Sequence, residues 1–378
     1  MKKMFIMVVV VLMFVTGCTK TNSQLTSNAD NQLGSSGTIP FLTYYQDQSG
    51  KIDAKLSMWN IDQGTVTFSD DLVYSAKKTP EDDRVEPITW DGNKKLLLHK
   101  TSAPEGLYKA ESKVIEKYTM DSIYGRDITA VKNLTADGKT SDYDLFLNCP
   151  DGVVKKKIKA QYQNIDGKKK NIMGEGDVPC NIDFDRNTGE IRLIFHYYEE
   201  GHSFLYIGKC NIADTNNIHW ERIVLPDAIE TGGGYIPTPY NTVLIGSTYY
   251  IEGGPSLVEA DIDTGKSMVD DSLINTCKSI VQEGRFVPDF QKGVIPVGVY
   301  NDILILRIEV SGDTNLEHLM CAVERGEFKG AIHVKQDEVW EIINSEKEVV
   351  SKIDNRNKKL YKEFDIDFIA FPILSKRR

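Results

Sequence analysis

The stretch LSMWNIDQGTVTFSDDL, residues 56–72, has a counterpart later in the chain, LVEADIDTGKSMVDDSL, residues 257–273. The two align without gaps and share six residues: Leu56 with Leu257, Ile61 with Ile262, Asp62 with Asp263, Gly64 with Gly265, Asp70 with Asp271 and Leu72 with Leu273. In each copy, strand-forming residues flank a short turn that carries aspartate and glycine. The pair predicts a β-hairpin unit that recurs along the chain.

Residue patterns elsewhere from Ile39 onward also predict strands. Short runs rich in Val, Ile, Tyr, Phe and Leu alternate with Asp, Asn and Gly turns, as in residues 88–100, 131–148 and 158–172. An Asp-Gly pair between two such runs favours a tight hairpin, because both residues tolerate positive φ. Helical periodicity is scarce, and its best candidate is residues 272–286, about three turns.

The spacing of the repeat indicates the fold. Its two copies are 201 residues apart, which is about four units of 50 residues, the size of a four-stranded propeller blade. Residues 39–378 would hold about seven such units, so the sequence predicts an all-β protein, a β-propeller of about seven blades. Pairing of the early strand 39–45 with the last strand, within 364–374, would cover both edges. Tandem β-sandwich domains are the alternative, because they also consist of many short strands.

The N-terminus has the layout of a secretory signal. Two lysines, Lys2 and Lys3, precede the uninterrupted apolar run Met4–Val15. Such a charged start and short apolar segment are typical of a signal peptide. A membrane-spanning helix needs about 20 apolar residues, so this run is too short to span. Residues 1–17 are therefore predicted to be a signal peptide.

Residues 15–18, Val-Thr-Gly-Cys, resemble the lipobox of bacterial lipoprotein precursors. In that family the signal is removed before the cysteine, whose thiol carries diacylglycerol, so the resemblance implies that Cys18 is lipidated and begins the mature chain. Each buried acyl CH₂ contributes about 0.8 kcal/mol, and two or three chains would anchor the protein firmly. The implied location is the bacterial cell membrane, lipid-anchored and facing the extracytoplasmic side. A general secretory signal followed by an unmodified cysteine is the alternative.

The segment after the cysteine is polar. Residues 19–38 contain no aromatic residue and only two large apolar ones, Leu25 and Leu33. Such a segment cannot bury enough surface to offset its ordering entropy. The predicted organisation is a signal peptide (1–17), a lipidated cysteine with a flexible tether (18–38) and a β-propeller-like extracytoplasmic domain (39–378).

The charge of the chain limits its partners. The formal net charge is −10, and removal of residues 1–17 leaves 43 basic and 55 acidic side chains, a charge of −12. An acidic body disfavours nucleic acid. The expected partners are the membrane, through the lipid anchor, and a glycan or protein ligand.

The cysteines predict no metal or redox motif. Apart from Cys18 there are five, scattered singly, and no C-x-x-C occurs. An odd number cannot pair completely within the chain. They lie in apolar contexts, so buried thiols are expected.

Two further segments resemble parts of known propellers. ADIDTGK, residues 260–266, resembles the outer hairpin turn of quinoprotein-like propellers, in which aspartate caps the turn and glycine is left-handed. Residues 181–226 are similar to one blade of sialidase and related glycosidase propellers, with a D-x-x-T-G turn, an aromatic strand and a hairpin before a tryptophan. The Asp-box of that family, S-x-D-x-G-x-x-W, is degenerate here, because Asp214 lies six residues before Trp220 and Asn217 replaces glycine.

Tyrosine pairs are the candidate ligand-binding residues. They are Tyr197 with Tyr198 and Tyr249 with Tyr250. Neighbours in a strand point to opposite faces, so one ring of each pair is expected in the core and the other can face a groove. Aromatic rings with a hydroxyl suit stacking on sugars or peptides. Simple packing in strands explains the same residues.

No catalytic residue, metal ligand or cofactor motif is predicted. His196 and His202 are expected to flank a hairpin rather than to hold a metal, and neither H-E-x-x-H nor G-x-S-x-G occurs. The sequence favours a protein without enzymatic activity, a membrane-anchored ligand-binding or scaffolding β-propeller. A surface-tethered glycan-acting hydrolase of the sialidase or glycosidase type is the alternative.

Overall fold

The computed structural model describes most of the chain from Gly37 onward. The described residues are 37–49, 51–76, 85–90, 96–100, 106–109, 114–117, 122–134, 140–149, 151–159, 162–165, 168–171, 180–199, 202–226, 242–253, 256–282, 294–311, 316–335, 339–358, 360 and 369–371. The predicted signal peptide, Cys18 and nearly all of the predicted tether lie outside them.

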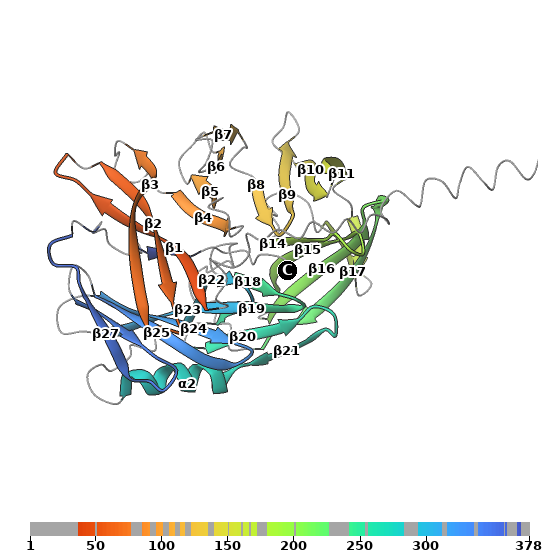
Figure 1. Ribbon diagram of the computed structural model, residues 1–378. Helices are drawn as coiled ribbons and strands as arrows, with labels where there is room; N and C mark the ends of the chain where they lie inside the picture. Colours follow the sequence, from red (N-terminus) through yellow and green to blue (C-terminus); the bar gives the residue numbers. More distant parts are fainter. Residues whose placement is uncertain are drawn as a thin grey trace, which may run out of the picture. The chain divides into compact units, whose positions relative to one another are not determined.

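Three sheets in the first half of the chain have four antiparallel strands each (Figure 1). The first contains β1 (Thr38–Gln46), β2 (Ile52–Asn60) and β3 (Thr65–Ala76), with β28 (Ile369–Ala370) beside β1. The second contains β4 (Val85–Trp90), β5 (Leu96–Lys100), β6 (Gly106–Lys109) and β7 (Val114–Lys117). The third contains β8 (Ser122–Gly125), β9 (Ile128–Leu134), β10 (Thr140–Cys149) and β11 (Gly152–Lys159).

The second half of the chain continues this pattern. A hairpin of β12 (Tyr162–Ile165) and β13 (Lys168–Asn171) comes first. A sheet of β14 (Asn181–Asp185), β15 (Glu190–Glu199), β16 (His202–Asn211) and β17 (Asp214–Val224) follows. Next is a sheet of β18 (Thr242–Ile245), β19 (Thr248–Gly253), β20 (Ser256–Asp261) and β21 (Lys266–Val269), and then helix α2 (Asp271–Gln282). The last sheet contains β22 (Val294–Tyr300), β23 (Ile303–Ser311), β24 (Leu316–Glu324), β25 (Glu327–Lys335), β26 (Val339–Ile343) and β27 (Val349–Asp354).

The all-β prediction is confirmed, and the one helix expected at residues 272–286 is present as α2. Every sheet is open rather than closed on itself. Repeat spacing predicts about seven units, whereas the described residues form six sheets of four or more strands, because the last sheet takes in six strands.

The predicted pairing of the early strand with the last one is also confirmed. Leu42 and Thr43 of β1 pair antiparallel with Ala370 and Ile369 of β28. The next residue, Phe371, is 2% exposed and packs its ring 5.3 Å from that of Phe41 and 6.5 Å from that of Trp59, centroid to centroid. Residues from the two ends of the body therefore share one sheet and one core.

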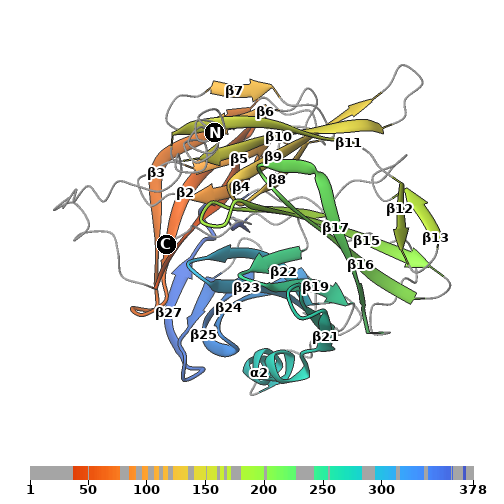
Figure 2. The ribbon, with the colours of Figure 1, turned by 90° about the vertical axis from the view of Figure 1, so that its right-hand side faces the viewer.

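Most of the sheets contact the sheet that follows them in the chain. β1 contacts β4, β8 contacts β14, β11 and β21 both contact β17, and β18 contacts β22. The last sheet packs on the first, because Met320 and Trp340 share a buried cluster with Ile39 and Trp59. Figure 2 shows α2 beneath the strands of the last two sheets, and it contacts β20 and β25.

The sequence repeat corresponds to two equivalent hairpins, β2–β3 and β20–β21. Asn60 pairs with Thr65 in the first, and Asp261 pairs with Lys266 in the second. Both turns contain a left-handed glycine, with φ of 60° at Gly64 and 71° at Gly265. Asp261 Oδ1 accepts hydrogen bonds from the amides of Asp263 (2.9 Å) and Thr264 (3.1 Å), which is the capping role that the quinoprotein-like resemblance implies.

The two turn glycines offer a matched stability test. A Cβ at Gly64 would lie 2.3 Å from Val350 Cγ2, whereas a Cβ at Gly265 would meet open space. Both positions have positive φ, so alanine at Gly265 should cost about 1 kcal/mol from backbone strain alone. We expect Gly64→Ala to cost more, about 2 kcal/mol, because Val350 must also shift. Urea unfolding of both variants measures the difference, and equal losses would contradict the role of Val350.

Candidate functional site

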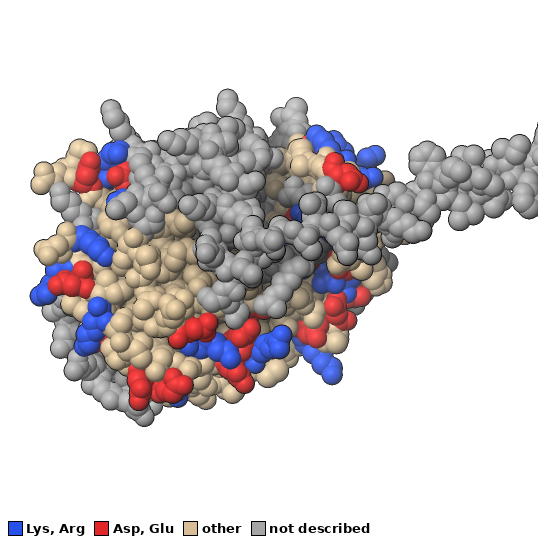
Figure 3. Space-filling view, viewed as in Figure 1, with Lys and Arg blue, Asp and Glu red and all other residues tan. Residues whose placement is uncertain are grey.

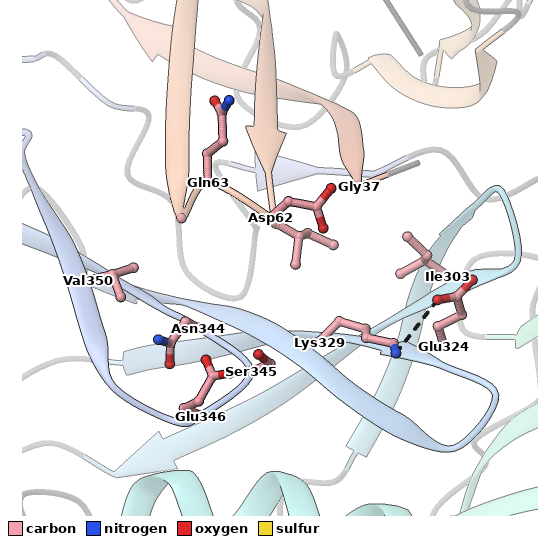
Figure 4. Close-up of a pocket in the computed structure, with 12 residues that line it drawn as sticks. Gly37, Asp62, Gln63, Ile303, Glu324, Lys329, Asn344, Ser345, Glu346 and Val350 are labelled. Atoms are coloured by element: carbon pink, nitrogen blue, oxygen red, sulfur yellow. Dashed lines mark ion pairs between the residues drawn. The ribbon is translucent and has the colours of Figure 1, made fainter. Parts of the chain in front are cut away.

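A polar cleft of about 440 Å³ lies between the first and last sheets (Figure 4). One side is formed by Gly37 and the β2–β3 turn with Asp62. The opposite side is formed by the hairpins β24–β25 and β26–β27, which supply Lys329 near the start of β25 and Asn344 in the turn after β26. The turn ends of three hairpins therefore meet at one opening, and antiparallel strand pairing sets the position of each.

The Asp62 side of the cleft is held by backbone hydrogen bonds. The amide of Ile61 donates to Gly37 O at 2.8 Å, and the amide of Gln63 donates to Asn60 Oδ1 at 2.9 Å. The carboxylate of Asp62 packs directly on Gly37, where a Cβ would lie 2.5 Å from Asp62 Oδ2. A glycine at position 37 is therefore what allows the carboxylate to lie there.

Lys329 carries the positive charge of the cleft. Its Nζ lies 2.8 Å from Glu327 Oε2 and 3.8 Å from Glu324 Oε2, the latter contact drawn as a dashed line in Figure 4. The hydrogen bond to Glu327 raises the pKa of Lys329 above its usual value, so the ammonium stays charged. The turn before it contains two left-handed residues, Arg325 (φ 50°) and Gly326 (φ 78°).

The third loop presents polar groups toward the same opening. Asn344 Oδ1 accepts a hydrogen bond from the amide of Glu348 at 2.8 Å, and Asn344 N donates to Glu348 O at 3.0 Å. These bonds fix the turn that exposes Ser345 and Glu346. The cleft thus holds three carboxylates, those of Asp62, Glu324 and Glu346, beside one ammonium group.

The chemistry of this cleft suits a ligand rich in hydroxyl or amide groups. Carboxylates accept hydrogen bonds, the ammonium of Lys329 donates them, and hydrogen bonds to charged groups are the stronger ones. Most small-molecule pockets are predominantly apolar, and this one is not. Sugars and extended peptides present the polar groups that such a lining can bind.

A second cavity, of about 340 Å³, lies on the sheet that resembles a glycosidase blade. Its lining includes Thr188, Glu190, Lys209 and Asp214. Residues 181–226 do form a four-stranded sheet, as that resemblance implies. The polar residues of its turns cap backbone amides: Asp185 Oδ1 accepts from Asn187 N at 2.8 Å, and Asn211 Oδ1 from Ala213 N at 2.9 Å.

Of the four predicted tyrosines, the three with described side chains do not line the cleft. Tyr249 is fully buried, and its hydroxyl donates to Cys180 Sγ at 3.2 Å, so its ring is a core element. Tyr197 is half-buried and packs edge-on against Tyr206, with centroids 5.2 Å apart. Tyr250 is half-buried and packs against the hydrophobic cluster that contains Leu273 and Cys277 of α2. The side chain of Tyr198 lies outside the described residues, although its backbone pairs with Ser203.

The histidines flank a hairpin, as predicted. His196 of β15 pairs with Leu205, and His202 of β16 pairs with Glu199. Burial lowers the pKa of His196 to about 4. In the part of the chain that the structure describes, no group of three His, Cys, Asp or Glu side chains could hold a metal ion.

A carboxyl pair lies at the start of α2, outside the cleft. Asp270 Oδ1 accepts a hydrogen bond from the amide of Leu273 at 2.8 Å and so caps the helix. Glu259 of β20 is hydrogen-bonded to Asp270 and pairs across the sheet with Tyr250. Burial, followed by that bond and the Asp270 charge, raises the pKa of Glu259 to about 7.

This pair predicts a pH dependence of stability. The folded state binds the Glu259 proton more tightly than the unfolded chain, where the pKa is 4.5, so its contribution is complete below pH 4.5 and is lost as pH rises through about 7. Because Glu259 is only half-buried, we expect a loss of about 1–2 kcal/mol. Glu259→Gln should abolish this component, whereas Glu327→Gln, an exposed control, should retain it. Urea unfolding at pH 5 and at pH 8 measures the unfolding free energy of each variant. A difference between the two pH values in Glu259→Gln as large as in the unchanged protein would contradict the assignment.

The described surface carries mixed charge. On the face shown in Figure 3, acidic and basic side chains lie interspersed around a tan area of other residues. Two lysines of β11 form ion pairs, since Lys155 lies 2.9 Å from Asp144 and Lys157 lies 3.2 Å from Asp142. Among the helices of the described residues, none has the length and apolar character needed to cross a membrane.

No family model matches the chain, and no curated protein matches it. Among solved structures, a protein described as a 6-phosphogluconolactonase from Bacteroides fragilis aligns over 92% of this chain and 98% of its own, at 9% identity and a TM-score of 0.36. A similarly described protein from Bacteroides uniformis covers 86% and 97%, at 9% identity and a TM-score of 0.33. Prolyl oligopeptidase B from Galerina marginata covers 87% and 51%, at 8% identity and a TM-score of 0.36. At these scores the fold assignment rests on the strand pairing alone.

Proposed function

We propose that the chain is a lipid-anchored extracytoplasmic protein whose body, residues 39–378, is a β-propeller that binds or scaffolds a ligand. The observation that carries the fold is the pairing of β28 with β1, which completes the first sheet with a strand from the far end of the chain. Four-stranded sheets that mostly contact the next sheet along the chain support the same arrangement. The lipobox residues 15–18 support the anchor.

The polar cleft is the proposed ligand site. It collects hydrogen-bonding groups from three hairpins where the first and last sheets meet. We assign it a glycan or an extended peptide, because these ligands offer many hydroxyl or amide groups to carboxylates and an ammonium group. In the alternative, the protein would hydrolyse a glycan rather than only bind it. The observation that favours this alternative is the four-stranded sheet at residues 181–226.

The anchor is tested by metabolic labelling with an alkyne fatty acid and by membrane fractionation. The full-length protein should carry the label, partition into detergent and lack residues 1–17 by mass spectrometry. Cys18→Ser should lose the label entirely, because no other thiol lies in a lipobox. Cys149→Ser is the matched control and should remain labelled. An intact Met1 or an unmodified Cys18 in the native protein would overturn the anchor.

Ligand binding is tested with the full chain in detergent against glycan and peptide panels. Lys329→Ala should weaken binding about tenfold, the loss expected for one hydrogen bond to a charged group. Lys266→Ala, an exposed lysine at the start of β21, should leave binding unchanged. Equal affinities of the unchanged protein, Lys329→Ala and Lys266→Ala would mean that the ligand binds elsewhere. Formation of a hydrolysis product would favour the hydrolase alternative.

A further inference from the structure

Two cysteines from different elements meet between α2 and the six-stranded sheet. Cys277 lies on α2 and Cys321 on β24, and both are 0% exposed. They belong to one buried cluster with Leu273 and Leu319, which lie near them on the same two elements. The helix therefore presents Cys277 inward, toward the six-stranded sheet.

The two thiols are in contact. The side chain of Cys321 is hydrogen-bonded to that of Cys277. Burial, followed by this bond, raises the pKa of Cys321 well above its usual value, so the Cys321 thiol is protonated in the folded state near neutral pH. The pair is thus a dithiol held in place by apolar packing.

The other described cysteines have different surroundings. Cys180 Sγ accepts from the Tyr249 hydroxyl at 3.2 Å and donates to Ile194 O at 3.2 Å. Cys210 is buried on β16, and Cys149, half-buried on β10, packs against the same cluster as Cys210. These three therefore serve as internal references for the reactivity of the pair.

We propose that Cys277 and Cys321 form a redox-sensitive modification site that closes to a disulfide and fastens α2 to the six-stranded sheet. The oxidant is a disulfide, either a small molecule or a protein. One deprotonated thiol attacks it and releases one reduced thiol, which leaves a mixed disulfide on the protein. The second thiolate then attacks that bond and releases the second reduced thiol. Two protein thiols are oxidised and one external disulfide is reduced to two thiols.

Burial controls the rate of this reaction. A disulfide reagent can reach the pair only when α2 moves away from the sheet, because both sulfurs are inaccessible in the folded state. Half-buried Cys149 should instead react directly and form a mixed disulfide with the reagent. The pair should therefore oxidise slowly, and faster in urea concentrations below the unfolding transition.

The closed form should be more stable than the open one. The bond would join residues 44 positions apart, and a loop of this length restricts the unfolded chain. For a protein of this size, the midpoint of thermal unfolding should rise by about 2–5 °C.

The experiment incubates the full chain in detergent with oxidised glutathione and maps its peptides by mass spectrometry. We expect a peptide pair joined through Cys277 and Cys321, reversal by dithiothreitol, and the higher unfolding temperature. Cys277→Ala and Cys321→Ala should each lose the temperature rise, whereas Cys149→Ala should keep it. Free thiols at both positions after treatment in sub-denaturing urea, pairing with other cysteines, or a lower unfolding temperature on oxidation would each overturn the proposal. The outcome is independent of the lipid anchor and of the ligand.

Discussion

Replacement of Phe371 by alanine should destabilise the protein by about 3–5 kcal/mol. Phe371 is 2% exposed, and its ring lies against Phe41 of β1 and Trp59 of β2. Removing it leaves a cavity between aromatic rings that cannot collapse, since both partners are held by strand pairing. Loss of the ring also weakens the β1–β28 contact.

Equilibrium unfolding in urea measures this loss. Phe371→Leu retains most of the volume and should cost less than about 1.5 kcal/mol. Val349→Ala on β27, where the side chain is 46% exposed, is the matched control and should change stability by less than about 0.5 kcal/mol. A loss below about 1 kcal/mol in Phe371→Ala would mean that the last strand contributes little to the first sheet.

Replacement of Asp183 by alanine should cost about 3 kcal/mol. Asp183, with 1% of its side chain exposed, accepts two hydrogen bonds from Arg126, Nε to Oδ1 and Nη2 to Oδ2, both 2.8 Å. The backbones also meet there, because the amide of Phe184 donates to Arg126 O at 3.1 Å. Removing the carboxylate leaves a largely buried guanidinium without its partner, which is the costly outcome for an internal ion pair.

A double replacement separates the ion pair from the packing. Arg126→Leu with Asp183→Leu removes both charges, so it should be less destabilising than Asp183→Ala alone. The exposed pair Asp354 and Arg356 is the control, and Asp354→Ala should cause no measurable change because water already screens it. If Asp183→Ala lost no more stability than Asp354→Ala, the contact between β8 and β14 would not depend on this ion pair.

Local features of the fold could be predicted because they depend on residues close in sequence. The turn at Asp261 and Gly265 requires a capping carboxylate and a left-handed residue within five positions, and the sequence supplies both. The β1–β28 pairing could be predicted for another reason. Exposed strand edges favour aggregation, and pairing the first strand of the body with the last covers an edge of each. The arrangement of the sheets depends on many weak contacts and has no such signature.

The candidate site could not be predicted. Lys329 follows an ordinary turn and Asn344 stands in another, and nothing in either hairpin indicates that it lies opposite Asp62, more than 250 residues earlier. The alternation of side chains along a strand predicts that the two rings of a Tyr-Tyr pair point to opposite faces. It does not tell which of the two rings points into the core. In the second pair the inward ring is that of Tyr249, because its hydroxyl finds a buried partner in Cys180.

The β1–β28 pairing also sets a condition on how the chain can fold as it is made. Leu42 leaves the ribosome 328 residues before its partner Ala370, since 370 minus 42 is 328. Until then, one edge of β1 stays unpaired in a nascent chain that is otherwise able to form successive local hairpins. Completing the first sheet therefore requires a contact of very high sequence separation, which is expected to slow folding and to leave the unfinished chain open to wrong strand partners.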